Sequence, residues 1–95
     1  MFVEVIGTRP LPDDVDRDDV EDLLTDALGP DGEVTGAGSG AGSGAGRWNL
    51  DVEVSGPFFA ALTRMAVALV AHDLGWVLLR PESQRVGFSA ADLRP

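Results

Sequence analysis

Residues 47–55 read Arg47-Trp48-Asn49-Leu50-Asp51-Val52-Glu53-Val54-Ser55, and apolar and polar side chains alternate along this stretch. A period of two is typical of a β-strand with one face against a core and the other in water. The apolar side chains are expected in the core: Trp48, Leu50, Val52 and Val54. The polar side chains are expected on the open face of the sheet, where they form a candidate contact surface: Arg47, Asn49, Asp51 and Glu53.

The eleven residues at 36–46, immediately before this strand, read GAGSGAGSGAG. Side chains no larger than serine bury almost nothing, so we interpret 36–46 as a flexible hairpin loop that leads into the strand. The glycines partly match a nucleotide-binding loop. However, such a loop opens a helix rather than a strand, and its phosphate-gripping form needs a lysine, which this chain lacks.

Two amphipathic helices are predicted, one on each side of the loop and strand. The first is expected to begin at Pro12 with Asp13 and Asp14, and to end at Gly29-Pro30. Its apolar side chains recur with helical spacing: Val20, Leu23, Leu24, Ala27 and Leu28. The second is expected to begin at Gly56-Pro57, with proline in the first helical position, and to end near His72. Its apolar surface is broad and is expected to be mostly interior: Phe58, Phe59, Leu62, Met65, Ala66, Leu69 and Val70.

Further strands are predicted at 2–6, 33–36 and 76–80, which gives the order β-α-β-β-α-β. This order indicates an α+β, ferredoxin-like domain: a four-stranded antiparallel sheet with two helices on one face. Right-handed crossovers would place the first and third strands side by side in the middle. We expect a single domain over 1–95, with 82–95 as a C-terminal extension in which 86–88 pairs or packs as a short flap.

The charge of the chain is unevenly distributed. Residues 1–34 contain eleven acidic residues against two arginines, whereas 35–95 contain five of each, so the first third carries the whole formal charge of −9. Such a field repels phosphate backbones and argues against nucleic-acid binding. It steers a basic protein partner toward the chain, although solubility alone also accounts for an acidic surface.

Four aspartates of the first predicted helix follow one another at intervals of four residues, and are candidate partner-binding residues: Asp14, Asp18, Asp22 and Asp26. Like charges at this spacing destabilise a helix slightly, so the ridge suggests a cationic partner, while a merely solvated face is the alternative. A calcium-binding EF-hand loop is excluded, because positions six and twelve of that loop would be Asp19 and Thr25.

No catalytic motif stands out, and whether the protein is an enzyme stays undecided, with the balance against it. His72 is the sole histidine, and a cation at a helix C-terminus needs no catalytic explanation. Cysteine is absent, and no cofactor or metal is expected. There is no signal-peptide pattern and no apolar run long enough to span a bilayer, so a soluble, cytoplasmic protein without membrane association is expected.

The run Gly32–Ser39, followed by the acidic strand Asn49–Val54, resembles a pattern in small acidic bacterial proteins of the immunity type. Such proteins accompany secreted or contact-delivered toxins. The resemblance implies capture of a basic toxin domain and no catalysis. This chain differs in having a longer, repetitive glycine tract.

Two function classes stay open. The first is a non-enzymatic module that binds a basic protein through the acidic helix and the open sheet face, with Trp76 as an additional contact because exposed aromatic residues are common in interfaces. A homodimer through the sheet belongs to the same class. The second is a small-molecule-binding or enzymatic ferredoxin-like domain, with a pocket between the sheet and the C-terminal segment.

Overall fold

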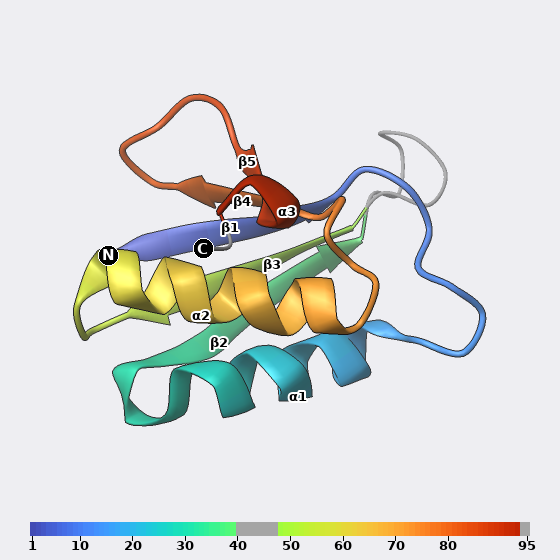
Figure 1. Cartoon of the computed structure of the whole chain (residues 1–95), viewed down its shortest axis with the longest axis horizontal. Coiled ribbons are helices and arrows are strands. Elements are labelled where there is room, and N and C mark those ends of the chain that lie inside the picture. Colours follow the sequence, from blue (N-terminus) through green and yellow to red (C-terminus); the bar gives the residue numbers. More distant parts are fainter. Residues whose placement is uncertain (40–47, 94–95) are drawn as a thin grey trace.

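A computed structural model describes residues 1–39 and 48–93 of the chain (Figure 1). Within these residues an antiparallel sheet of five strands is combined with three α-helices. The elements follow one another as β1 (Phe2–Gly7), α1 (Arg17–Leu28), the 3-10 turn Gly29–Asp31, β2 (Gly32–Ser39), β3 (Trp48–Val54), α2 (Phe58–Ala71), β4 (Leu78–Pro81), β5 (Phe88–Ser89) and α3 (Ala90–Leu93). The α+β class is therefore confirmed.

The strands lie in the order β2-β3-β1-β4-β5. As expected, the first strand pairs with the third, with Val3 opposite Val52 and Val5 opposite Leu50. The prediction of four strands and two helices is wrong, because part of the expected C-terminal extension adds β5 to the edge of β4 and then forms α3. Backbone hydrogen bonds from Ala90 to Val77 and from Ala91 to Gly75 hold this segment against the domain.

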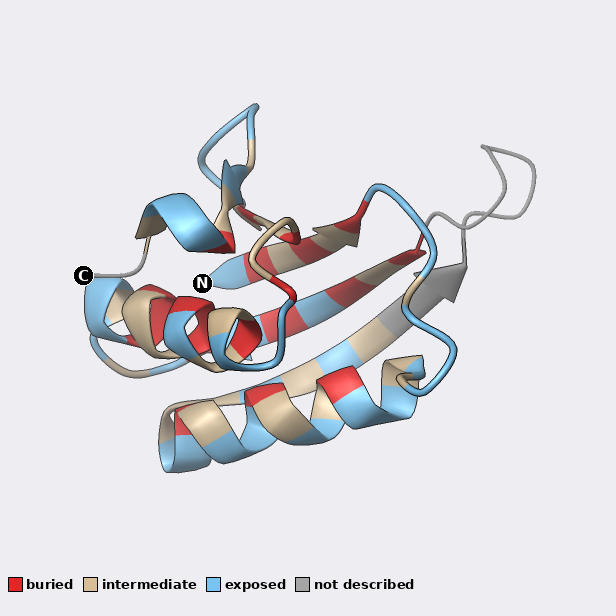
Figure 2. Ribbon diagram, turned by 45° about the vertical axis from the view of Figure 1, so that its right-hand side comes forward, coloured by how far each residue is buried: buried red, intermediate tan, exposed pale blue. Residues whose placement is uncertain are grey.

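The alternation of β3 produces the predicted division of faces. Its four apolar side chains are buried in the core, whereas Asp51 and Glu53 are exposed and Asn49 is half-buried. The helices α1 and α2 lie side by side over the core face of the sheet, and no described helix covers the other face (Figures 1 and 2). Successive side chains of β3 therefore point alternately toward the helix layer and toward the open face.

Strand β2 is longer than predicted, since it continues to Ser39 and includes the first residues of the glycine tract. The expected loop boundary at residue 36 is therefore wrong. Small side chains do not prevent pairing here, because the backbone of β2 is hydrogen-bonded to β3, with an irregularity of register between Val34 and Gly36. The rest of the tract, 40–46, lies outside the described residues.

Helix α1 begins at Arg17, five residues later than the predicted start at Pro12. The reason is a capping box: the Asp16 carboxylate accepts a hydrogen bond from the Asp19 backbone at 3.0 Å, and the Asp19 carboxylate accepts one from the Asp16 backbone at 3.1 Å. Asp13 and Asp14 consequently precede the helix. The helix ends at Gly29 as predicted, and this residue has a positive φ of 56° that favours glycine.

Helix α2 buries one stripe of side chains: Ala61, Leu62, Met65, Ala66 and Leu69. The helix is less interior than expected, because Phe59 is 81% exposed and Val67 is 47% exposed. The sheet, α1 and α3 contact only part of the helix circumference, which leaves these side chains without cover. Pro57 caps the helix instead of occupying its first position, and the last predicted strand begins at Leu78 rather than Trp76.

Candidate functional site

An acidic concavity lies along α1, at its junction with the segment that follows α2. It is a shallow groove of about 380 Å³. Four aspartates, one histidine and three apolar residues line it: Asp14, Asp19, Asp22, Asp26, His72, Val15, Leu23 and Leu74. We call these residues the acidic groove.

Local structure explains why these side chains meet. Asp19, Asp22 and Asp26 lie three and four residues apart in α1, so helical periodicity directs them to one side. Asp14 joins them from the turn before the helix, in which the Val15 N–H donates to the Pro12 carbonyl at 2.9 Å. Across the groove, His72 caps the C-terminus of α2.

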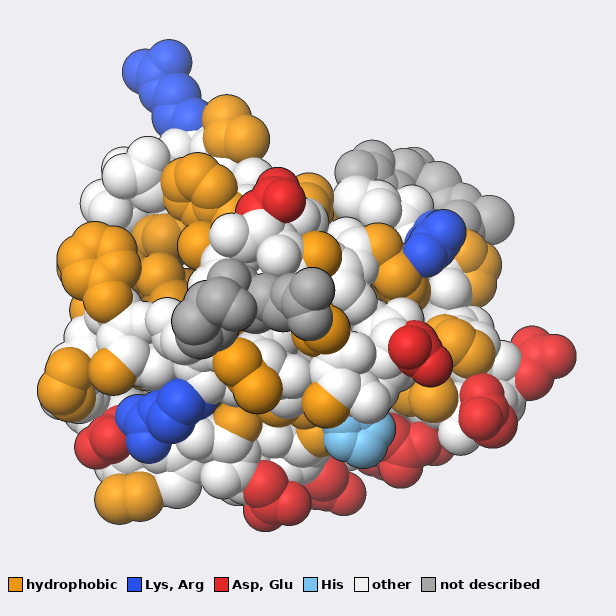
Figure 3. Space-filling view, viewed as in Figure 1, with side chains coloured by type: hydrophobic (Ala, Val, Ile, Leu, Met, Phe, Trp, Pro, Cys, Tyr) orange, Lys and Arg blue, Asp and Glu red, His pale blue; other side chains and the backbone are white. Residues whose placement is uncertain are grey.

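The charge of the acidic groove is not neutralised by the ion pairs that the described residues form. Those pairs are Arg64 with Asp31 at 2.7 Å and Arg80 with Glu4 at 2.9 Å, and neither includes a residue of the groove. All four of its aspartates are exposed. Figure 3 shows the acidic side chains gathered along the α1 side of the molecule, next to the histidine.

This combination of groups fits the side chains of arginine and lysine. The apolar side chains of Val15, Leu23 and Leu74 offer a surface for an aliphatic stem, while the carboxylates around them accept hydrogen bonds from a guanidinium or ammonium group. Within residues 1–39 and 48–93, no three acidic or histidine side chains are grouped closely enough to hold a metal ion.

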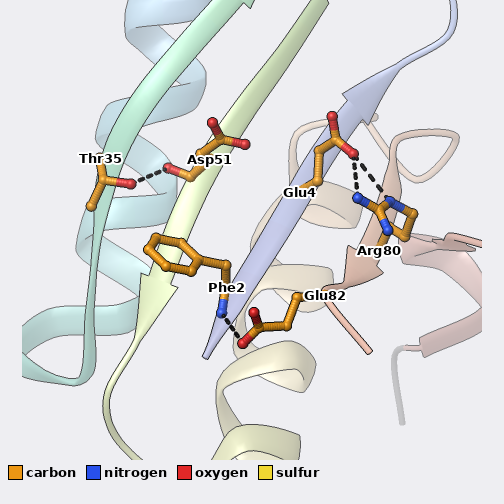
Figure 4. Close-up of a pocket in the computed structure, with 6 residues that line it drawn as sticks. All are labelled: Phe2, Glu4, Thr35, Asp51, Arg80 and Glu82. Carbon is orange, nitrogen blue, oxygen red and sulfur yellow. Dashed lines mark hydrogen bonds and ion pairs between the residues drawn. The ribbon is translucent and has the colours of Figure 1, made fainter. Parts of the chain in front are cut away.

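A second polar concavity lies on the open face of the sheet, on the side opposite the helices (Figure 4). It is a depression of about 380 Å³ lined by Phe2, Glu4, Thr35, Asp51, Arg80 and Glu82. Register places Glu4 of β1 directly opposite Asp51 of β3. Two nitrogen atoms of Arg80, Nε and Nη2, donate to Glu4 Oε1 at 3.1 and 2.9 Å, which offsets the repulsion between these neighbouring carboxylates.

The predicted site residues do not form one surface. Asp14, Asp22 and Asp26 meet in the acidic groove, whereas Asp18 is exposed on α1 but does not line it. Asn49, Asp51 and Glu53 belong to the open face, where Asn49 donates to Glu4 at 3.4 Å. The sheet separates these two groups, so one flat partner surface cannot contact both. Arg47 lies outside the described residues.

Trp76 is half-buried, packs against the edge of the core and lines neither of the two concavities. Its ring meets that of Trp48 in an edge-to-face contact with centroids 6.4 Å apart, and the Arg9 guanidinium lies 4.4 Å from its centroid. The Trp48 indole also donates to the Arg9 carbonyl at 3.1 Å. The role of Trp76 as a partner contact stays a prediction.

Sequence reasoning missed several residues that the structure places in these concavities. Asp19 entered the sequence argument only in the exclusion of an EF-hand loop, and His72 only as the end of a helix. Once the start of α1 is known, helical spacing places Asp19 on the same side of the helix as Asp22 and Asp26. The pair of Glu4 with Arg80 joins residues 76 positions apart, and no local pattern signals such a contact.

Comparison of this chain with protein-family models, with curated proteins and with solved structures finds no significant match. Among the helices of the described residues, none combines the length and apolar character needed to cross a membrane.

Proposed function

We propose that this chain is a non-enzymatic module that binds a basic protein partner through the acidic groove. The observation that carries the proposal is the set of four exposed aspartates around an apolar floor, none of which takes part in the ion pairs of the described residues. The aliphatic stem of an arginine or lysine side chain of a partner can pack on the apolar floor while its charged group binds the aspartates.

The position of the acids in α1 supports this proposal. Asp22 and Asp26 are four residues apart and lie beyond the first turn of the helix, where carboxylates repel each other and gain little from the helix dipole. Their presence lowers helix stability, so stability does not explain them. The formal charge of −9 also accelerates encounter with a cationic partner.

The partner class that we propose is a basic toxin domain, with this chain as its immunity or inhibitor protein. The acidic groove and the pattern of Gly32–Ser39 with Asn49–Val54 support this assignment. We further propose that the segment from β1 to β4 is a ferredoxin-like unit, to which β5 and α3 are added. The antiparallel order β2-β3-β1-β4 within the sheet supports that interpretation.

The test is a nuclear magnetic resonance titration of the ¹⁵N-labelled protein with a poly-arginine peptide, with a poly-citrulline peptide as the neutral control. We expect shifts at the amides of Asp22, Asp26 and His72 that weaken when salt rises from about 50 to about 500 mM. The triple variant Asp14→Asn, Asp22→Asn, Asp26→Asn should lower the affinity at least about tenfold.

The matched control removes the same number of charges from the open face: Glu33→Gln, Asp51→Asn and Glu53→Gln. If both triple variants lose affinity equally, only total charge matters and the groove is not the site. If neither does, the proposal is wrong. Co-purification with the product of a neighbouring gene for a basic protein, lost in the groove variant alone, would identify the partner.

A second candidate function is the binding of a small molecule in the open-face depression. Its favouring observation is a concavity in which an aromatic ring, a hydroxyl and an arginine–glutamate pair converge from β1, β2 and β4 (Figure 4). The surrounding carboxylates select a polar, positively charged compound. A rise in melting temperature with such a compound, abolished by Asp51→Asn, would support this function; no rise across a metabolite panel would argue against it.

A further inference from the structure

An apolar concavity lies at the end of the molecule where α2 begins. It is a groove of about 520 Å³ between the N-terminal half of α2, the turn from β4 to β5, and α3. Most of its lining is apolar: Met1, Phe58, Phe59, Leu62, Pro81, Phe88 and Leu93, with Thr63, Ser83 and Gln84 adding polar atoms. We call these ten residues the apolar groove.

Three of these side chains are exposed to an extent that is unusual for apolar residues. Phe59 is 81% exposed, Met1 51% and Phe88 43%. Hydrophobic side chains are gathered at this end of the molecule in Figure 3. An exposed apolar patch on a small domain is typical of a surface that contacts another molecule.

The apolar groove carries both halves of a self-complementary contact. Phe59 projects from its wall, and the concavity lies beside it on the same surface. We propose that the chain forms a two-fold homodimer in which Phe59 of each copy enters the apolar groove of the other. In such an isologous interface the same patch serves as knob and as hole.

Charge argues against the basic partner of the acidic groove as the occupant of the apolar groove. The ten side chains that line the apolar groove carry no formal charge, so they offer nothing to recognise a cation. The aspartates that line the acidic groove belong to α1 and the turn before it. Two copies joined through their apolar grooves therefore bring no lining carboxylates together, although their total charges still repel.

The exposed area is of the size that a weak dimer needs. With about 150–250 Å² for a large side chain, Phe59, Phe88 and Met1 expose on the order of 350 Å² per copy. A standard interface buries about 800 Å² per partner, of which roughly two thirds is apolar in homodimers. These three residues thus supply more than half of the apolar contact.

The first test is sedimentation equilibrium of the purified chain from about 10 to about 500 µM. We expect a concentration-dependent dimer whose fraction increases between about 50 and about 500 mM salt, because salt screens the repulsion between copies. Phe59→Glu should raise the dissociation constant at least about tenfold. Val67→Glu, which adds the same charge to an exposed apolar position of α2 outside the groove, should not.

The second test does not depend on the stability of a Phe59 variant. Because the chain has no cysteine, Ser83→Cys places a single thiol on the rim of the apolar groove, and a short bismaleimide should join two copies. Thr25→Cys on the exposed side of α1 is the control and should stay uncrosslinked.

A monomer at the highest concentration in both salts would overturn the proposal, as would equal crosslinking of the two cysteine variants. Binding of dodecanoate by the monomer, with shifts confined to the apolar groove, would assign the groove to a small apolar ligand and also overturn it. Failure of the dimer proposal is distinguishable from failure of the proposed function. The affinity for a basic partner is expected to fall as salt rises, whereas the affinity between two copies is expected to increase.

Discussion

The indole rings of Trp48 and Trp76 meet edge to face, with centroids 6.4 Å apart and an angle of 80° between their planes. Trp48 begins β3 and Trp76 lies two residues before β4, so the contact connects β3 with the segment that leads into β4, on either side of β1. Gly7, at the end of β1, makes room for it. A Cβ atom at Gly7 would lie 1.9 Å from Cε2 of Trp48.

Gly7→Ala should therefore destabilise the domain by about 1–3 kcal/mol, because the indole or the strand must shift. Urea denaturation monitored by tryptophan fluorescence measures the change. Gly36→Ala is the control: its Cβ would lie 3.4 Å from Asp51 Oδ2, an ordinary contact, and the effect should stay below about 0.5 kcal/mol. Equal losses at both positions would contradict the packing described for Trp48.

The acids of α1 should have opposite effects on stability according to position. Asp16→Ala removes the cap of the helix and should cost about 1 kcal/mol. Asp26→Asn removes a carboxylate from the last turn, four residues after Asp22, and should stabilise the domain by a few tenths of a kcal/mol at low salt. Thermal unfolding at low and high salt distinguishes the two, since only the Asp26 effect is strongly screened.

A gain in stability with Asp26→Asn that accompanies a loss of binding to a basic partner would mark Asp26 as a residue retained for function. A loss of stability instead would mean that the Asp26 carboxylate makes a favourable contact, and the argument from repulsion would fail.

The pair of Glu4 with Arg80 should contribute modestly to stability. The two side chains are 30% and 33% exposed, so solvent screens their attraction. A double-mutant cycle with Glu4→Gln and Arg80→Gln should give a coupling energy of about 0.5–1 kcal/mol, reduced by added salt. A coupling near zero would indicate that the two hydrogen bonds from Arg80 to Glu4 Oε1 are not maintained in solution.

The adjacent phenylalanines of α2 should respond differently to truncation. Phe58 is half-buried and packs against the core, so Phe58→Ala should destabilise the domain by about 1–3 kcal/mol. Phe59→Ala should change stability by less than about 0.5 kcal/mol at concentrations at which the protein is monomeric. Chemical denaturation of the two variants in parallel makes the comparison. A large loss for Phe59→Ala would mean that its ring is covered within one chain.

The candidate site was predicted only in part. Spacing identified Asp22 and Asp26, because both lie within one helix and periodicity relates them. It misplaced Asp14, which precedes the helix, because the capping box of Asp16 and Asp19 starts α1 later than proline and acid content suggested. The sequence also grouped the acids of α1 with those of β3, although the sheet separates them.

Local sequence was sufficient where one physical rule acts over neighbouring residues. The alternation at 48–54 determined which side chains of β3 enter the core, and apolar spacing with a terminal glycine determined where α1 ends. Only the tertiary structure determined which other elements each face of a helix or strand contacts. Three features illustrate this: Glu4 pairs with Arg80, Trp48 packs over Gly7, and Phe59 stays exposed. Each depends on elements that are distant in the chain, and no periodic pattern in the sequence indicates how such elements approach one another.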